Sequence, residues 1–139
     1  MLTAQNKGLF VFAIPLVSRR RARDWQRVLD NLQATLQSIL NQSDRRFVVL
    51  IAAEDEILLP EVKDSHVRLC VVAGLDFERV NYHNSHSDAT LKRTLLSEEA
   101  CKLGASYLMF ADADDLISKH IVAYVNSNHE LLRNLIFAG

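Results

Sequence analysis

The stretch Tyr107-Leu-Met-Phe-Ala-Asp-Ala-Asp-Asp115 decides the predicted fold, because an apolar run is followed at once by an acidic turn. Tyr107 to Ala111 is typical of a short strand buried on both faces, as in a parallel sheet. Asp112, Asp114 and Asp115 then place three carboxylates within four positions. Ligands of open parallel sheets bind beyond the carboxyl ends of the strands, so we expect a binding site at this turn.

Similar apolar runs upstream predict further buried strands at Leu9 to Ile14, Phe47 to Ala53 and Val67 to Val72. Apolar residues spaced by three and four predict helices at Asp24 to Asn41 and at Asp88 to Leu103. The second helix carries its apolar side at Leu91, Leu95, Ala100 and Leu103, and it is ended by Gly104. Ser118 is predicted to cap a last helix that runs to about Ser127. The alternation predicts the α/β class: a Rossmann-like open, mostly parallel sheet with helices on both faces.

Length and composition limit the classes of protein to which the chain can belong. Its 139 residues suit one domain, 1–139. A net charge of -1 does not indicate binding to nucleic acid or to an anionic membrane. No apolar run reaches the roughly 18 residues that predict a transmembrane segment, and Met1 to Lys7 has neither the charged region nor the small-residue cleavage site that would predict a signal peptide. Cys70 and Cys101 are predicted to be buried free thiols in a reducing compartment. A cytoplasmic location is therefore expected.

The acidic turn has the residue types of a divalent metal site. Carboxylates this close repel one another unless a cation or hydrogen-bond donors intervene. Mg²⁺ and Mn²⁺ prefer carboxylate oxygens and keep positions for water and phosphate, and such a cation neutralises the charge that develops on a diphosphate leaving group. The alternative is that one aspartate caps the next helix while the others are solvated, since Asp favours turns and caps in any protein.

The segment Leu103-Gly-Ala-Ser-Tyr-Leu-Met-Phe-Ala-Asp-Ala-Asp-Asp-Leu-Ile-Ser118 resembles the Asp-x-Asp region of family 2-type glycosyltransferases, which have the GT-A fold. Thr35-Leu-Gln-Ser-Ile-Leu-Asn-Gln42 and the strand after it resemble the first helix and second strand of that family, and Leu9 to Pro15 resembles its first strand. The chain is thus similar, over most of its length and in the expected order, to the nucleotide-sugar-binding half of those enzymes.

The resemblance implies roles for particular residues. It assigns Asp114 to a Mn²⁺ or Mg²⁺ ion, Asp112 to the metal or to the ribose, and Asp115 to the metal, with helix capping as the alternative for Asp115. In the family an acidic residue after the second strand contacts the base, and Glu54 and Asp55 stand at that place. The sequence there reads Ala-Ala-Glu-Asp-Glu where the family has an Asp-Asp-Gly-Ser type, which leaves the base, uracil or guanine, undecided. A solvated acidic loop is the alternative for both residues.

Several basic residues are candidates for phosphate contacts. Asp88-Ala-Thr-Leu-Lys92 resembles a stretch that precedes the metal strand in some family members, and it implies that Lys92 reaches a phosphate; the alternative is a surface helix residue. An arginine run after the first strand could face the pyrophosphate or form a solvated helix entry. Its members are Arg19, Arg20, Arg21 and Arg23. His83 and His86 are interpreted as residues of a polar surface loop.

The resemblance implies a metal-dependent glycosyltransferase that moves a sugar from a UDP- or GDP-linked donor to an unknown acceptor. No residue matches the catalytic base, and the acceptor-binding half of the family has no counterpart, so we expect the isolated chain to transfer sugar poorly and to form a homo-oligomer or bind a partner chain. One alternative is a non-catalytic nucleotide-sugar-binding or interaction module. Another is a phosphohydrolase of the haloacid-dehalogenase type, but that family places its aspartates early and has Thr or Val at the place of Leu116.

Overall fold

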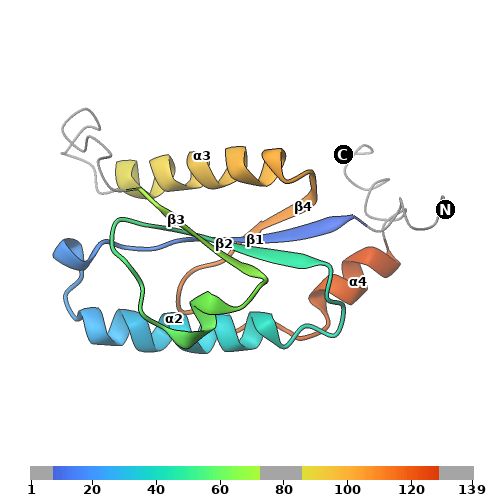
Figure 1. Ribbon diagram of the computed structural model, residues 1–139, viewed down its shortest axis with the longest axis horizontal. Helices are drawn as coiled ribbons and strands as arrows, with labels where there is room; N and C mark the ends of the chain where they lie inside the picture. Colours follow the sequence, from blue (N-terminus) through green and yellow to red (C-terminus); the bar gives the residue numbers. More distant parts are fainter. Residues whose placement is uncertain (1–7, 73–85, 129–139) are drawn as a thin grey trace.

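The computed structural model describes residues 8–72 and 86–128, with the side chains of the second range described from residue 89 on. Along the described chain the strands and helices alternate, as predicted (Figure 1). The elements are β1 (Leu9–Pro15), η1 (Arg19–Arg21), α2 (Trp25–Leu40), β2 (Phe47–Ala53), η2 (Pro60–Lys63), β3 (Val67–Val71), α3 (His86–Lys102), β4 (Ala105–Phe110) and α4 (Ile121–Ser127).

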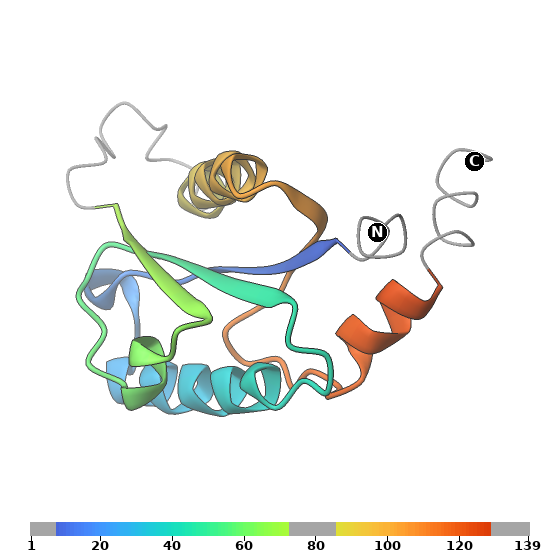
Figure 2. The same ribbon diagram turned by 45° about the vertical axis from the view of Figure 1, so that its right-hand side comes forward.

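The four described strands form one open sheet in the order β3-β2-β1-β4, and every neighbouring pair is parallel. α3 covers one face, while α2 and α4 lie on the other (Figure 1; Figure 2). The predicted α/β class, an open parallel sheet with helices on both faces, is confirmed. The chain moves outward from β1 to β2 and β3 and then returns through α3 to β4, on the other side of β1. The strand order therefore reverses between β1 and β4, where sheets of this kind bind ligands.

The central strand β1 is buried on both faces, which explains its continuous apolar sequence. Alternate residues point to opposite faces of a strand. One set packs against α2 in a cluster that includes Phe10, Phe12, Ile14, Leu32, Leu36 and Ile39. The other set packs on the α3 side in a cluster made by Val11, Ala13, Leu50, Ala52, Leu96 and Ala100. The sheet is thus held between two apolar layers, which leaves its carboxyl edge for polar residues.

The two ends of α3 agree closely with the sequence, but its buried face differs from the prediction. Beyond its last residue, Gly104 adopts a positive φ of 74°, a conformation that glycine reaches at little cost. Leu96 and Ala100 are buried together with Lys92, whereas Leu95 is only partly buried. Positions 92, 96 and 100 lie four apart along one ridge of the helix, and this ridge, not the most apolar one, lies on the sheet.

The prediction that Ser118 caps the last helix is wrong. α4 begins at Ile121, so His120 occupies the N-cap position. The side chain of His120 makes no capping hydrogen bond there. The hydroxyl of Ser118 instead accepts a hydrogen bond from the backbone N–H of His120 at 3.3 Å. The chain makes a further turn before the helix starts, so the serine lies too far upstream to reach the first helical N–H groups.

The cysteines also differ from expectation. Cys101 is exposed on the last turn of α3, so the prediction that it is buried is wrong. Cys70 is partly buried at the β3 edge of the sheet, and this burial raises the pKa of its thiol. In the described ranges no helix has both the length and the apolar character that crossing a membrane requires.

Candidate metal and nucleotide site

The three aspartates predicted as metal ligands lie together directly after β4. Asp112, Asp114 and Asp115 can each direct one carboxylate oxygen so that the three oxygens lie within 4.8 Å of one another. Asp112 and Asp114 are exposed and Asp115 is partly buried. Because β4 is next to β1, this cluster stands where the strand order reverses. The geometry is that of an all-oxygen donor set, which suits a hard divalent cation.

Two hydrogen bonds between Asp112 and Asp115 close the turn. The backbone N–H of Asp112 donates to Oδ2 of Asp115 at 2.8 Å, and the backbone N–H of Asp115 donates to the carbonyl oxygen of Asp112 at 3.0 Å. The alternative that Asp115 caps the next helix is wrong, since α4 begins only at Ile121. Asp115 therefore shapes the turn with one of its carboxylate oxygens.

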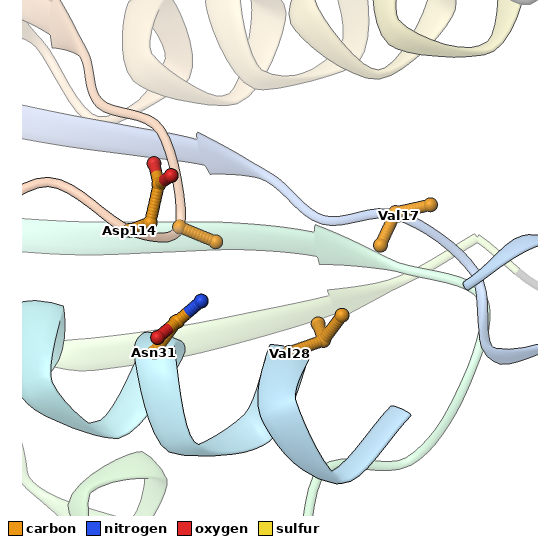
Figure 3. Close-up of a pocket in the computed structure, with 5 residues that line it drawn as sticks. Val17, Val28, Asn31 and Asp114 are labelled. Atoms are coloured by element: carbon orange, nitrogen blue, oxygen red, sulfur yellow. The ribbon is translucent and has the colours of Figure 1, made fainter. Parts of the chain in front are cut away.

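A small pocket of about 170 Å³ opens beside the turn. Its lining combines apolar side chains with an amide and a carboxylate, and Figure 3 shows how its labelled residues are arranged around it. The lining residues are Val17 after β1, Val28 and Asn31 on α2, and Ala113 and Asp114 on the turn. Sites for drug-sized ligands typically measure about 300–1,000 Å³, so this pocket is smaller than such a site.

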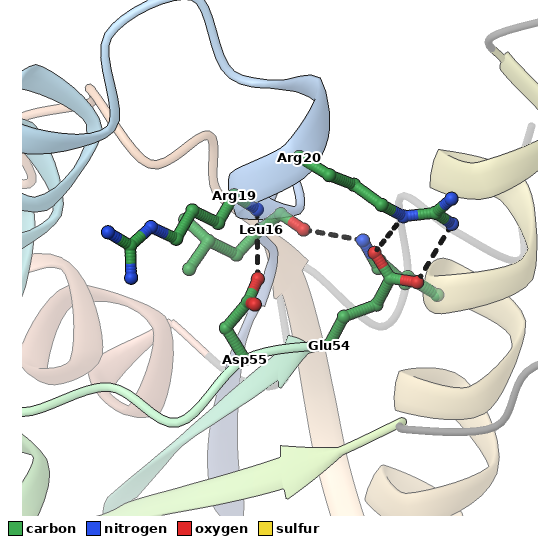
Figure 4. Close-up of polar contacts among 6 residues, drawn as sticks. Leu16, Arg19, Arg20, Glu54 and Asp55 are labelled. Atoms are coloured by element: carbon green, nitrogen blue, oxygen red, sulfur yellow. Dashed lines mark hydrogen bonds and ion pairs between the residues drawn. The ribbon is translucent and has the colours of Figure 1, made fainter.

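The arginine run and the acidic loop after β2 contact each other. The backbone N–H of Arg19 donates to Oδ2 of Asp55 at 2.8 Å, and Nη2 of Arg20 pairs with Oε1 of Glu54 at 3.1 Å (Figure 4). The sequence analysis expected the arginines and the acidic residues either to contact a ligand or to be solvated, and it did not predict that they contact each other. It joins the loops after β1 and β2, whose parallel strands end at the same edge of the sheet. The predicted contacts of Glu54 and Asp55 with a base stay predictions.

Lys92 lies at the same edge but is buried. Its side chain is 1% exposed, and Nζ donates to the carbonyl oxygen of Leu16, just beyond β1, at 2.6 Å. The alternative that Lys92 is a surface helix residue is therefore wrong. The ammonium connects α3 to the loop that follows β1, and its predicted contact with phosphate stays a prediction. On the next residue, the guanidinium of Arg93 lies 5.8 Å from the ring centre of Phe110.

The interpretation of His86 as a residue of a polar surface loop is wrong, and that of His83 is not tested. His83 lies outside the described residues, and His86 is the first residue of α3, with its side chain outside the described part. Among the described residues, the aspartates of the turn are the one group of three or more His, Cys, Asp or Glu side chains with metal-site spacing.

Sequence reasoning missed three α2-side residues that hold the segment after β4. Thr35, Ser38 and Gln42 all hydrogen-bond the stretch between Ala113 and Val122. A signal was available, because Thr35 and Ser38 stand among apolar positions of an amphipathic helix and Gln42 follows its end. What the signal lacks is the partner, which lies about eighty residues away along the chain.

Comparison with known proteins gives no further assignment: no family model, curated protein or solved structure matches this chain significantly.

Proposed function

We propose that this chain binds a nucleotide diphosphate sugar through a divalent cation at Asp112, Asp114 and Asp115, as the donor-binding portion of a glycosyltransferase. One observation carries the proposal: three carboxylates converge within 4.8 Å at the carboxyl end of β4, beside the point where the strand order reverses. Open parallel sheets bind nucleotides at this point, and clustered carboxylates need a cation or donors to offset their repulsion.

The donor set fits Mn²⁺ or Mg²⁺. Asp112 and Asp114 are exposed, so their carboxylates can turn toward a cation, and Asp115 offers its second oxygen. Both cations accept carboxylate oxygens while keeping positions for water and phosphate. When bound, the cation would neutralise negative charge on the diphosphate leaving group. The residues of the chain itself would hold that cation and orient the diphosphate over the edge of the sheet.

A melting experiment tests the proposal. We expect Mn²⁺ with UDP or GDP to raise the melting temperature, since ligand at a hundred times its Kd stabilises a protein by about 2.7 kcal/mol. Asp114→Ala should abolish the rise, because it removes a predicted ligand. Glu98→Ala, which removes an exposed carboxylate from α3, is the matched control and should keep the rise. An unchanged melt of the natural chain with both nucleotides would overturn the proposal.

Turnover separates an enzyme from a binding module. Release of UDP or GDP from a nucleotide sugar, measured by chromatography with Mn²⁺ present, would assign chemistry to the chain. Binding without any release would assign it to donor binding alone.

The partner we expect is a second copy of the chain. In the described sheet β4 pairs only with β1, and its sequence Ala105-Ser-Tyr-Leu-Met-Phe110 carries neither charge nor proline to protect the outer edge. Leu108 and Phe110 are 38% and 40% exposed. A two-fold pairing of such edges is the simplest closed arrangement. Light scattering that shows a monomer at high concentration would exclude it.

A further inference from the structure

One side of the α2 segment carries a row of hydrogen-bonding side chains that face the chain after β4. Thr35, Ser38 and Gln42 are spaced by three and four, so they lie on one stripe of the helix and its C-terminal extension. Oγ1 of Thr35 donates to the carbonyl oxygen of Ala113 at 3.0 Å. Oγ of Ser38 accepts from the backbone N–H of Ile117 at 3.0 Å. The row therefore contacts main-chain atoms on both sides of Asp114 and Asp115.

Burial holds the hydrogen bond of Thr35 in place, and a second hydrogen bond holds that of Ser38. Thr35 is fully buried, so bulk solvent does not reach its hydroxyl to compete for this hydrogen bond. The hydroxyl of Ser38 donates to the carbonyl oxygen of Thr35 at 2.7 Å, which orients its lone pairs toward Ile117. Each group satisfies a main-chain atom that has no strand or helix partner.

The position of Ala113 gives the Thr35 contact its importance. Ala113 lies between Asp112 and Asp114, so a bond to its carbonyl oxygen fixes the peptide that joins two predicted metal ligands. The Ser38 bond fixes the chain two residues beyond Asp115. Three carboxylates in one turn repel one another when they are charged, and hydrogen bonds from outside the turn oppose that repulsion.

We infer that Thr35 and Ser38 are positioning residues that hold the carboxylate turn, residues 112–115, in the arrangement that binds the cation. This inference rests on the proposed function. Neither side chain would touch the cation; both act through the main chain of the turn. Outer-shell groups that orient metal ligands are typically worth about 10–100-fold in metal affinity.

Ligand binding by single variants tests this role. Thr35→Val removes the hydroxyl and keeps the branched shape, whereas Thr35→Ser restores a hydroxyl at the same place. Ser38→Ala removes the acceptor for Ile117. The probe is UDP, and then GDP, titrated into each variant in excess Mn²⁺ and followed by calorimetry. Melting without ligand reports the structural effect of each change.

We expect Thr35→Val and Ser38→Ala to raise the Kd of the bound nucleotide by about tenfold or more, and Thr35→Ser to recover most of the loss. Gln37→Ala, the control, removes an α2 amide that donates to Glu61 away from the turn, and it should leave the Kd unchanged.

Equal Kd values for the natural chain, Thr35→Val and Ser38→Ala would overturn the inference and leave the proposed function standing. A natural chain that binds neither nucleotide would overturn both. Should Thr35→Val fail to fold, Ser38→Ala against Gln37→Ala decides the matter alone, because Ser38 is only partly buried.

Discussion

Gln42 caps a helix that begins about eighty residues away: its Oε1 accepts a hydrogen bond from the backbone N–H of Val122 at 3.2 Å, in the first turn of α4. Its Nε2 donates to the carbonyl oxygen of Ser118 at 2.6 Å. With 2% of Gln42 exposed, both ends of the amide are satisfied by main-chain atoms. One side chain thus joins the end of α2 to the start of α4 and replaces the local cap that α4 lacks.

We predict that Gln42→Leu lowers the free energy of unfolding by about 2 kcal/mol or more, because it leaves the buried N–H of Val122 without its acceptor and removes the donor to the carbonyl oxygen of Ser118. Urea unfolding followed by circular dichroism measures the change. Gln37→Leu is the control, since Gln37 is exposed and Gln33 also donates to the same Glu61. A loss for Gln42→Leu no larger than that of the control would contradict the capping role.

Lys92→Ala should lower the free energy of unfolding by about 2 kcal/mol or more, since it opens a cavity and removes the donor to the carbonyl of Leu16. Lys102→Ala, at an exposed lysine of the same helix that pairs with Glu99, should change it little. Chemical denaturation measures the free energy of unfolding of the two variants. Similar decreases for both would mean that the buried ammonium of Lys92 stabilises the fold no more than an exposed lysine does.

The same Lys92 variant tests the predicted phosphate contact. If Lys92 meets a phosphate, Lys92→Ala weakens the binding of UDP in Mn²⁺ more than that of uridine, since the nucleoside has no phosphate for the ammonium to contact. Calorimetric titrations of both ligands give the ratio. An equal loss for the two ligands, or no loss, would remove Lys92 from the site.

Gly8 is required by the close approach of the chain before β1 to Ser106 on β4. A Cβ on Gly8 would lie 1.8 Å from Oγ and 2.2 Å from Cβ of Ser106, and the latter atom cannot move away by rotating the side chain. We predict that Gly8→Ala costs about 1–3 kcal/mol of stability. Adding Ser106→Gly should recover part of it, as a double-mutant cycle would show. Additive losses would contradict the clash.

Asp64 should contribute to a loss of stability in acid. The backbone N–H of His66 donates to its carboxylate at 2.8 Å, and this bond, with the imidazole of His66, lowers the pKa of Asp64 below its ordinary value of 3.8. A lowered pKa in the folded state stabilises the fold above the unfolded pKa, and this contribution is lost as the pH falls through the folded value.

We therefore expect the free energy of unfolding to fall as the pH drops below about 4, and Asp64→Asn to make that fall smaller. Asparagine keeps an acceptor oxygen for His66 and does not titrate. Glu98→Gln, at an exposed site, serves as the comparison. Urea unfolding over this pH range measures both slopes, and identical slopes for Asp64→Asn and the natural chain would rule out the contribution.

The elements that the sequence predicted best are those with a strong local pattern. The strand Phe47 to Ala53 was predicted with the bounds that the structure shows, because a buried strand of a parallel sheet is apolar throughout and is flanked here by charges. Asp24 caps α2 at Arg27 N, where the predicted helix begins. Differences came where a distant partner replaced a local one: Gln42 caps α4 in place of Ser118, and the buried ammonium of Lys92 donates a hydrogen bond to the carbonyl oxygen of Leu16 where a surface residue would meet water.

The sequence by itself determined the α/β class, the order of the strands and helices along the chain, and the three carboxylates after β4, because hydrophobic periodicity and turn residues are local properties of the chain. Only the tertiary structure decided that β4 lies beside β1, that Arg20 pairs with Glu54, and that Thr35 and Ser38 hold the acidic turn. The side-chain hydrogen bonds among these relationships join residues 34 to 79 positions apart. A hydrogen bond over that separation depends on how the layers pack, which no local pattern encodes.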